Sequence, residues 1–278
     1  MERFLISGHG FSAEVTNSFG ADILSLKYDG EHVLVPLNSE SEREENPYLH
    51  GAPLLLPANR LVNGRFSFMG KNYTMPINEE STSCHIHGFL WQKEFRVISK
   101  KDSEIVMEYE NHGEIYPFCF HVLVKYFIDN TGFHSEYVIK NLEHGKMPLT
   151  FALHTTFVEP DFFKVPIDEC QEREENCVPT GRYTPLNELQ QSYKEGTYSK
   201  DNRVFGYYTS SGSRAQIGKF EYRVSDNFDY WIVYNAFGKG GFLCVEPQCG
   251  EVNGLNGKCR VLEAGESICF STSISEKI

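Results

Sequence analysis

Apolar residues recur at every second position in many short segments of the chain, which is the period of β-strands with one buried face. Residues 24–28 alternate in this way, Asp29-Gly30 supplies the positive φ angles of a tight turn, and 33–35 carry the partner strand. A second hairpin is predicted over 64–75, with its turn at Gly70. Further strands are predicted over 95–99, 105–109, 118–128, 133–139, 149–157, 230–234, 242–245 and 259–273.

Helical periodicity is weak along the whole chain. The best candidate for an amphipathic helix, 185–193, spans about two turns. Many short strands separated by turn signals indicate an all-β fold, a large and mostly antiparallel sandwich, rather than alternating strands and helices. No repeat period and no linker rich in Gly, Pro or Ser divides the chain, so we expect a single domain over residues 1–278.

Two acidic segments interrupt the strand pattern. Residues 38–46 carry charge without an apolar period, so we expect a solvated loop to which no function attaches. The least regular region, 159–199, contains four prolines and a second acidic run over 169–175. Because long irregular segments inside compact domains are often functional, we expect functional loops in this region.

The composition limits the classes of partner. With 278 residues, 40% of them hydrophobic and 23% charged, the chain is a folded globular protein. Its formal net charge of −12 repels polyanions, so we expect neither nucleic acid nor a membrane as a partner. No basic N-terminal segment precedes a long apolar run, and a cytoplasmic protein is expected. The eight cysteines include no C-x-x-C pair and are interpreted as reduced thiols.

One acid, Glu246, stands between an apolar run and Pro247. Because proline cannot donate to a strand ladder, we expect pairing to stop there and Glu246 to lie at a strand end, facing a cavity lined by loops. Partial desolvation would raise the pKa of its carboxyl toward neutrality, which suits a general base. The alternative is a solvated glutamate at a strand terminus, which is the more common outcome for a single motif.

Histidines and one arginine are the other candidates for chemistry. His85 and His87 share a face if their segment is extended, which suggests a metal site, but no second ligand pair with regular spacing follows and we expect no metal. His154 lies within an apolar strand, where a histidine is usually a hydrogen-bonded core residue. Arg60 ends an apolar run and needs a partner or a ligand, and its guanidinium suits hydroxyl oxygens or a carboxylate.

These residues belong to short motifs that follow one another in a fixed order. The motifs are Asn59-Arg60, Gly64 through Asn78, His87-Gly88-Phe89, Leu153 through Phe157, Val178 through Gly181 and Val245-Glu246-Pro247. Together, over residues 51–256, they resemble the aldose 1-epimerase (galactose mutarotase-like) family, and the ordered set is far more specific than any single member. The resemblance implies a single β-supersandwich whose concave face holds a sugar.

The resemblance also implies a role for each motif residue. Arg60, and more weakly Asn59, would bind the sugar, and His87 would contact the region of its ring oxygen. His154 would be the general acid and Glu246 the general base. Exchange of α and β anomers requires removal of the proton from the C1 hydroxyl and protonation of the ring oxygen, so one base and one acid are sufficient. We therefore expect a monosaccharide as the partner and no cofactor.

The chain departs from the family pattern in two places. Relatives that act on sugar phosphates commonly carry an arginine where this chain has Trp91, which favours an unphosphorylated sugar or a different contact to the phosphate. Trp91 is also a candidate stacking surface for a sugar, or a core residue. A family aspartate that binds sugar hydroxyls has two candidate counterparts here, Asp201 and Asp226, and the sequence does not separate them.

Three functions remain open at this point. The favoured one is a mutarotase that acts on a free aldose, because both acid and base are present. The second is a carbohydrate-binding or sensor protein without catalysis. The third is a hexose-phosphate mutarotase, which predicts a basic pocket. The sequence is compatible with a monomer or a homodimer.

Overall fold

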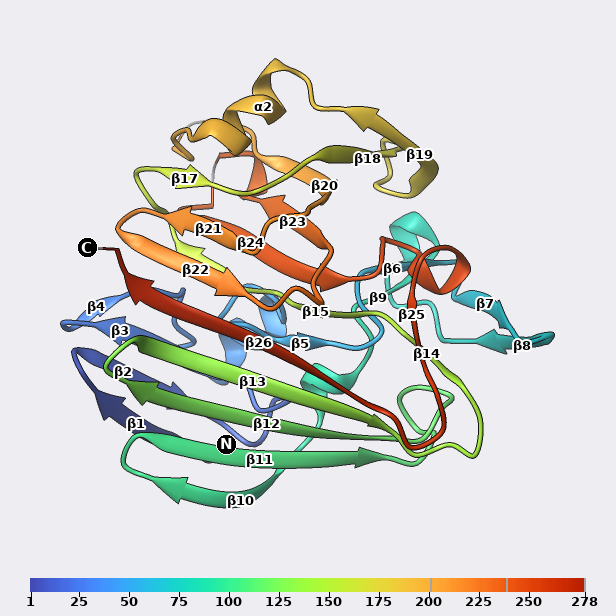
Figure 1. The fold of residues 1–278 in the computed structure, drawn as a ribbon, viewed down its shortest axis with the longest axis horizontal. Helices are drawn as coiled ribbons and strands as arrows, with labels where there is room; N and C mark the ends of the chain where they lie inside the picture. Colours follow the sequence, from blue (N-terminus) through green and yellow to red (C-terminus); the bar gives the residue numbers. More distant parts are fainter. Residues whose placement is uncertain (201, 239, 278) are drawn as a thin grey trace.

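Two large sheets form the body of the protein, for which the computed structural model describes residues 1–200, 202–238 and 240–277 (Figure 1). The first sheet has the order β10 (Arg96–Lys101), β11 (Glu104–Asn111), β12 (Phe120–Asp129), β13 (Gly132–Asn141), β26 (Ser267–Glu276), β22 (Phe220–Val224), β21 (Arg214–Ile217) and β17 (Phe163–Lys164). The second has the order β19 (Pro179–Pro185), β18 (Glu169–Arg173), β20 (Phe205–Thr209), β23 (Tyr230–Tyr234), β24 (Phe242–Cys249), β15 (Phe151–Leu153) and β5 (Leu54–Leu55), and β16 (Thr156–Val158) also pairs with β24.

Smaller strand groups and short helices surround these sheets. The groups are β1 (Phe4–Gly8), β2 (Phe11–Val15), β3 (Ile23–Tyr28) and β4 (Glu31–His32); β6 (Arg60–Val62) with β9 (Cys84–Ile86); β7 (Arg65–Phe68) with β8 (Lys71–Thr74); and β14 (Met147–Leu149) with β25 (Arg260–Leu262). The helices in the described residues are α1 (Glu40–Glu45) and α2 (Glu188–Glu195), with 3₁₀ turns at η1 (Glu80–Thr82), η2 (Leu90–Gln92), η3 (Ala236–Gly238) and η4 (Gly254–Asn256).

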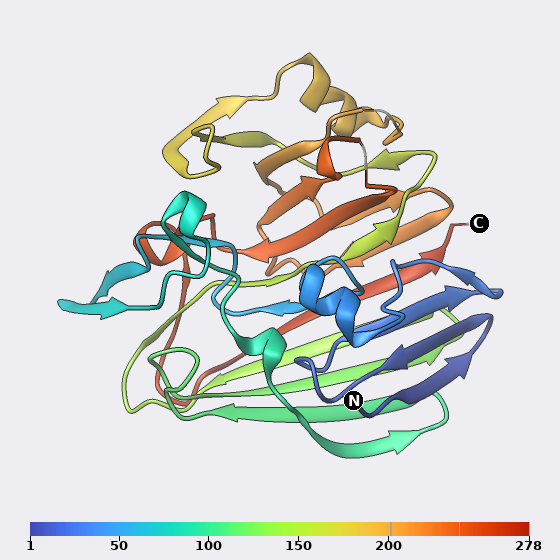
Figure 2. The ribbon, with the colours of Figure 1, turned by 180° about the vertical axis from the view of Figure 1, so that it is seen from behind.

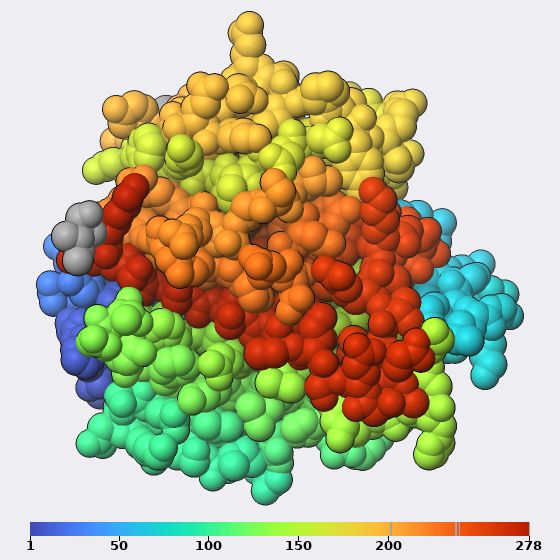
Figure 3. All heavy atoms as spheres, in the orientation of Figure 1, coloured from blue at the N-terminus to red at the C-terminus, as the bar shows by residue number. Residues whose placement is uncertain are grey.

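The predicted all-β, mostly antiparallel sandwich is confirmed, since the strands of both sheets pair antiparallel. Both predicted turns are present, that of β3–β4 at Asp29 and Gly30 and that of β7–β8 at Gly70. The partner strand of the first hairpin, β4, covers Glu31–His32 instead of the predicted 33–35. The cyan atoms of β7–β8 project from one side of the molecule (Figure 3). The region 159–199 is more regular than expected, because it holds β17, β18, β19 and α2.

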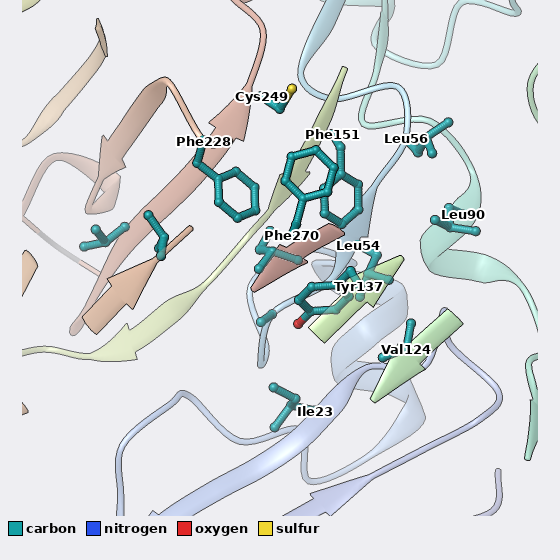
Figure 4. Packing of buried hydrophobic residues seen from close by; sticks show 14 of the residues in the cluster. Ile23, Leu54, Leu56, Leu90, Val124, Tyr137, Phe151, Phe228, Cys249 and Phe270 are labelled. Carbon is teal, nitrogen blue, oxygen red and sulfur yellow. The ribbon is translucent and has the colours of Figure 1, made fainter. Parts of the chain in front are cut away.

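Side chains of the two sheets meet in an aromatic core (Figure 4). Phe151 on β15 lies 4.9 Å, between ring centroids, from Phe270 on β26 and 5.7 Å from Tyr137 on β13. Buried and half-buried residues alternate along the whole of β12, as the period-two pattern predicts for a strand with one face on the core. The largest hydrophobic cluster extends in sequence from Ile6 to Ile274 and includes both sheets. The single domain over 1–278 stays a prediction.

Strand β24 does not end before Pro247, so this part of the prediction was wrong. The strand continues to Cys249, with Glu246 paired to Ile232 and Pro247 paired to Trp231. On its other edge, β15 and β16 pair with the two ends of β24 and leave a gap between them. Pro247 lies opposite this gap, where no ladder hydrogen bond needs its missing N–H.

The gap arises because the single strand predicted over 149–157 is two strands. Between β15 and β16, the backbone N–H of His154 donates to the carbonyl of Pro53 at 3.0 Å instead of to β24. The backbone of Thr155 accepts from Val245 at 2.9 Å, which keeps the connection close to the sheet. His154 therefore lies at an interruption of the sheet and not within a continuous apolar strand.

The charged segment 38–46 is not a solvated loop, which corrects a second expectation. It forms α1, which begins after Ser39, whose hydroxyl accepts from the backbone N–H of Glu42 at 3.3 Å. Arg43 points inward, is 3% exposed and forms an ion pair with the fully buried Asp22. Figure 2 shows α1 in blue on the rear side of the molecule, beside the N-terminal strands. Because Arg43 is the one buried residue of α1, this helix has no apolar period in its sequence.

Two further features of the chain bear on its organisation. The last strand, β26, lies inside the first sheet, between β13 and β22. No helix in the described part of the chain has the length and apolar character needed to cross a membrane.

Arg43→Met is expected to lower the free energy of unfolding by about 3–5 kcal/mol, because it leaves the buried carboxylate of Asp22 without its cation. Asp22 would keep only the backbone N–H groups of Ile23 and Ala52, at 2.7 and 3.1 Å. The double variant Asp22→Asn/Arg43→Met should recover a large part of the loss. Urea unfolding followed by circular dichroism measures both.

Arg3→Met is the matched control, since Arg3 also pairs with a carboxylate, Glu14, but at the surface, where its side chain is 40% exposed. It should cost less than about 1 kcal/mol. An Arg43→Met protein as stable as this control would contradict the role given to the buried pair.

Candidate active site

A cavity of about 260 Å³ opens next to β24. It is lined by Asn59, Arg60, Ile86, His87, His154, Cys177, Phe205, Tyr207, Ile232, Tyr234 and Glu246. All five residues singled out in the sequence as catalytic or sugar-binding are in this set, although they come from four separate segments of the chain. The structure thus brings these five residues together, whereas no residue of the motifs over 64–78 and 178–181 is in the lining.

The floor of the cavity is one face of the second sheet. Because side chains alternate along a strand, Ile232 and Tyr234 on β23 face the same side as Glu246 on β24. Phe205 and Tyr207 extend this face on β20. The opposite wall is formed by β6 and β9, which lie near the loop between β18 and β19 (Figure 1 and Figure 2).

Glu246 and His154 form a close pair in this cavity. The Oε1 atom of Glu246 lies 3.5 Å from Nε2 of His154, and the two side chains are 4% and 12% exposed. Burial raises the pKa of Glu246 to about 8, although the charge of Arg60 opposes the rise. Burial also lowers the pKa of His154 to about 4. Between these two values the pair holds one proton and carries no net charge.

His87 reaches the cavity through an unusual backbone. His87 and Gly88 have φ angles of 62° and 60°, and a Cβ on Gly88 would stand 1.9 Å from the carbonyl oxygen of Leu56. Only glycine fits there, so the close approach fixes the position of the preceding histidine. The backbone N–H of His87 donates to the carbonyl of Asn59 at 3.0 Å. Burial, with the neighbouring His154 and Arg60, holds the pKa of His87 well below its usual value.

His85 does not share the environment of His87. It is fully buried, its Nδ1 lies 2.7 Å from the carbonyl oxygen of Pro76, and it is absent from the cavity lining. The switch to positive φ at His87 breaks the strand alternation that would have put both imidazoles on one face. The two histidines therefore do not form a ligand pair.

Potential metal ligands come together elsewhere in the described residues, at His154, Cys244 and Glu246, whose ligand atoms lie within 4.8 Å of one another. Each has protein contacts of its own. The acid and imidazole pair with each other, and Sγ of Cys244 lies 3.5 Å from the hydroxyl of Thr156. We assign no metal to this group.

Arg60 has a partner that sequence reasoning missed. Its Nε and Nη2 atoms each donate to the carboxylate of Glu79 at 2.6 Å, and Nη1 donates to the hydroxyl of Tyr207 at 2.9 Å. Asn59 precedes it with φ of 56°, and its side-chain amide donates to Gln248 at 3.4 Å. The sequence indicated only that Arg60, at the end of an apolar run, requires a partner, and it did not identify Glu79 as that partner.

Tyr48 is a second residue that the sequence did not reveal. Its ring centroid lies 4.6 Å from that of His87, 5.9 Å from His154 and 5.2 Å from Trp91. Tyr48 follows α1, and Arg43 of that helix also donates to the carbonyl of Pro47 at 3.2 Å. The buried ion pair of α1 thereby fixes the backbone that carries Tyr48 to the two histidines.

Three other candidates lie outside the cavity lining or outside the described chain. Trp91 packs against Tyr48 and a small apolar cluster, with Nε1 donating to the carbonyl of Gly88 at 3.1 Å, so it does not present a stacking surface to the cavity. Asp226 is exposed and away from the lining. Asp201 lies outside the described residues.

The fold and the grouped motifs define a class of protein, the galactose mutarotase-like β-sandwiches. A galactose mutarotase-like protein from Clostridium acetobutylicum superposes with a TM-score of 0.89 at 21% identity, over 99% of this chain and 95% of that one. The aldose epimerase homologue from Caenorhabditis elegans gives a TM-score of 0.82 at 15% identity, over 100% and 99%. These likenesses show the fold.

The family model for aldose 1-epimerase matches residues 3–275, and the chain belongs to this family. The uncharacterized protein YihR of Escherichia coli is 27% identical over 172 residues, 58% of this chain and 54% of the relative. Galactose mutarotase from Mus musculus is 25% identical over 233 residues, 74% of this chain and 66% of the relative. The matches thus span less than two thirds of the length of either relative.

Glu246→Gln is expected to raise the free energy of unfolding above that of the wild type at alkaline pH. In the wild type, the unfolded chain releases this proton near the ordinary pKa of 4.5, whereas the folded protein retains it up to about pH 8. The wild type therefore loses stability as pH rises through this interval, and glutamine does not. The difference should be small below the interval and reach at most about 5 kcal/mol above it.

Urea unfolding of both proteins at a series of pH values measures this difference, and subtraction cancels the titration of other groups. A difference that does not change with pH would contradict the raised pKa of the Glu246 carboxyl.

Proposed function

We propose that the protein is an aldose 1-epimerase, a mutarotase that interconverts the α and β anomers of a free monosaccharide by acid–base ring opening. The observation that carries this proposal is the pairing of Glu246 and His154, whose Oε1 and Nε2 atoms lie 3.5 Å apart in the lining of one cavity. One proton donor and one proton acceptor are what the reaction needs. Membership of the aldose 1-epimerase family supports the same reaction class.

In the proposed mechanism, the carboxylate of Glu246 removes the proton from the C1 hydroxyl. The C1–O5 bond breaks as a carbonyl forms at C1, and the electron pair that leaves with O5 takes a proton from the imidazolium of His154. Rotation about the C1–C2 bond turns the other carbonyl face toward O5. Ring closure by the reverse proton transfers gives the other anomer and restores both side chains.

Burial alone favours the neutral form of the pair, with the proton on Glu246, as the pKa values of about 8 and about 4 indicate. The form required for ring opening, carboxylate and imidazolium, holds the same number of protons. The ratio of the two forms therefore does not depend on pH. Arg60 favours the carboxylate, because its charge lowers the pKa of Glu246.

The remaining lining residues suit a sugar in the proposed complex. Arg60 and Asn59 would bind hydroxyl groups, and His87, kept neutral by burial, would offer one ring nitrogen near the ring oxygen. Its Nδ1 is buried without a hydrogen-bond partner among the described residues. Phe205 and Tyr234 supply aromatic surface for the apolar face of the sugar ring.

Glu246→Gln and His154→Asn should each reduce catalysed mutarotation of α-D-glucose or α-D-galactose by about 10²-fold or more, because each removes one proton-transfer group. Polarimetry on freshly dissolved sugar measures the rate. His121→Asn is the control, since His121 pairs with Glu108 on the first sheet, away from the cavity. Its rate should equal that of the wild type.

A folded wild type that binds aldoses but leaves their anomerisation at the spontaneous rate would assign the cavity to a sugar-binding protein instead. Unchanged rates in both site variants would contradict the acid–base assignment while leaving the activity in place.

The pH dependence of kcat/KM should show a plateau between about pH 4 and about pH 8, the values of the two site groups. Below the plateau both groups are protonated and no base remains, and above it both are deprotonated and no acid remains. Initial rates corrected for the spontaneous reaction test this shape. A rate that only rises through pH 8 would show that the ionised acid beside neutral imidazole is the active form.

A further inference from the structure

Arg60 is the one lysine or arginine among the described residues that line the cavity. A guanidinium has five N–H groups. Three of those of Arg60 are directed at Glu79 and Tyr207, at distances of 2.6, 2.6 and 2.9 Å. Two N–H groups of Arg60 remain for a ligand, but the positive charge of the guanidinium is already balanced by the carboxylate of Glu79.

Glu79 is held in this position by its own surroundings. Its backbone N–H and carbonyl pair with Cys84, each at 3.1 Å, at the entry to β9. The hydroxyl of Thr82 donates to its carboxylate. The side chain is 21% exposed and does not belong to the cavity lining. Glu79 therefore cancels the charge of Arg60 without taking space from a ligand.

The other lining residues in the described chain include no lysine or arginine. Arg173 is outside this set, and its guanidinium carbon lies 3.9 Å from the ring centroid of the lining residue Phe205. Glu246 and His154 face each other and together hold one proton, and the remaining lining residues in the described chain are uncharged side chains and the imidazole of His87. The chain as a whole carries a formal net charge of −12. A cavity of this kind offers hydrogen bonds to hydroxyl groups, but no net attraction to an anion.

We propose that Glu79 is a specificity-determining residue, which restricts the cavity to neutral aldoses and excludes aldose phosphates and uronates. The inference rests on the proposed function and names the substrate class of the same site. Removal of the carboxylate charge would leave Arg60 as an unbalanced cation at the cavity wall. At a separation of a few ångströms near a protein surface, one such charge is worth about ten- to a hundredfold in the affinity for an anion.

Glu79→Gln tests the proposal because the amide keeps the size and shape of the side chain. Glu80→Gln is the matched control, since it removes the same charge from the next residue, which is exposed and starts η1. Isothermal titration calorimetry of each protein with D-glucose, D-glucuronate and D-glucose 6-phosphate gives the affinities. Far-ultraviolet circular dichroism checks folding, and Glu79→Asn serves as a second variant if Glu79→Gln does not fold.

We expect the wild type to bind D-glucose at least about tenfold more tightly than either anion. In Glu79→Gln the affinity for both anions should rise about ten- to a hundredfold while that for D-glucose changes little, and in Glu80→Gln all three affinities should stay at the wild-type values.

Two results would overturn the inference alone: a wild type that prefers the anionic sugars, or a Glu79→Gln protein with no gain for them over Glu80→Gln. Polarimetry on the same preparations separates this outcome from failure of the proposed function. A wild type that neither binds an aldose nor accelerates its mutarotation would overturn both.

Discussion

Burial of β24 on both faces is the constraint on which the site depends. Leu243 and Val245 face the core between the two sheets, while Glu246 and Gln248 face the opposite way and are also buried. That second face needs a cover, and the segments that carry Asn59, His87 and Tyr48 supply it. The segments that enclose this face and form the cavity also shield the carboxyl group of Glu246 from water. Burial of the Glu246 carboxyl therefore lowers the stability of the fold at neutral pH, and it gives this group a pKa near that pH.

Much of the fold could be predicted from the sequence because its determinants are local. Period-two alternation identified β10, β11, β12, β13 and β26 of the first sheet and β15, β16, β23 and β24 of the second, and Asp29-Gly30 and Gly70 fixed two turns. It did not identify β17, β21 and β22 of the first sheet or β5, β18, β19 and β20 of the second. The errors came from partners distant in the chain. Pro247 was expected to end strand pairing because it has no N–H to donate. It is accommodated because the segment beside it on this edge, at Thr155, 92 residues earlier in the chain, lies in the gap between β15 and β16. Likewise, α1 is held by Asp22 rather than by any apolar stripe of its own.

The same distinction applies to the site. The ordered motifs identified Arg60, His87, His154 and Glu246, because each stands in a recognisable local context. Residues that act through these groups stayed hidden. Glu79 is an ordinary surface-like glutamate in the sequence, and only the folded chain brings it to the guanidinium of Arg60. Residues that line the cavity within recognisable motifs are therefore easier to find from a sequence than residues that set the charge and position of their neighbours.

The position of β26 has a consequence for how the protein is made. Because this strand pairs with β13 on one side and β22 on the other, the first sheet remains two separate halves until residues 267–276 have been synthesised. A ribosome produces the chain from its N-terminus, so the edges of β13 and β22 stay open on the growing polypeptide until β26 has been made. Chaperones that shield such edges would have most to do before β26 emerges, and this strand then joins the two halves.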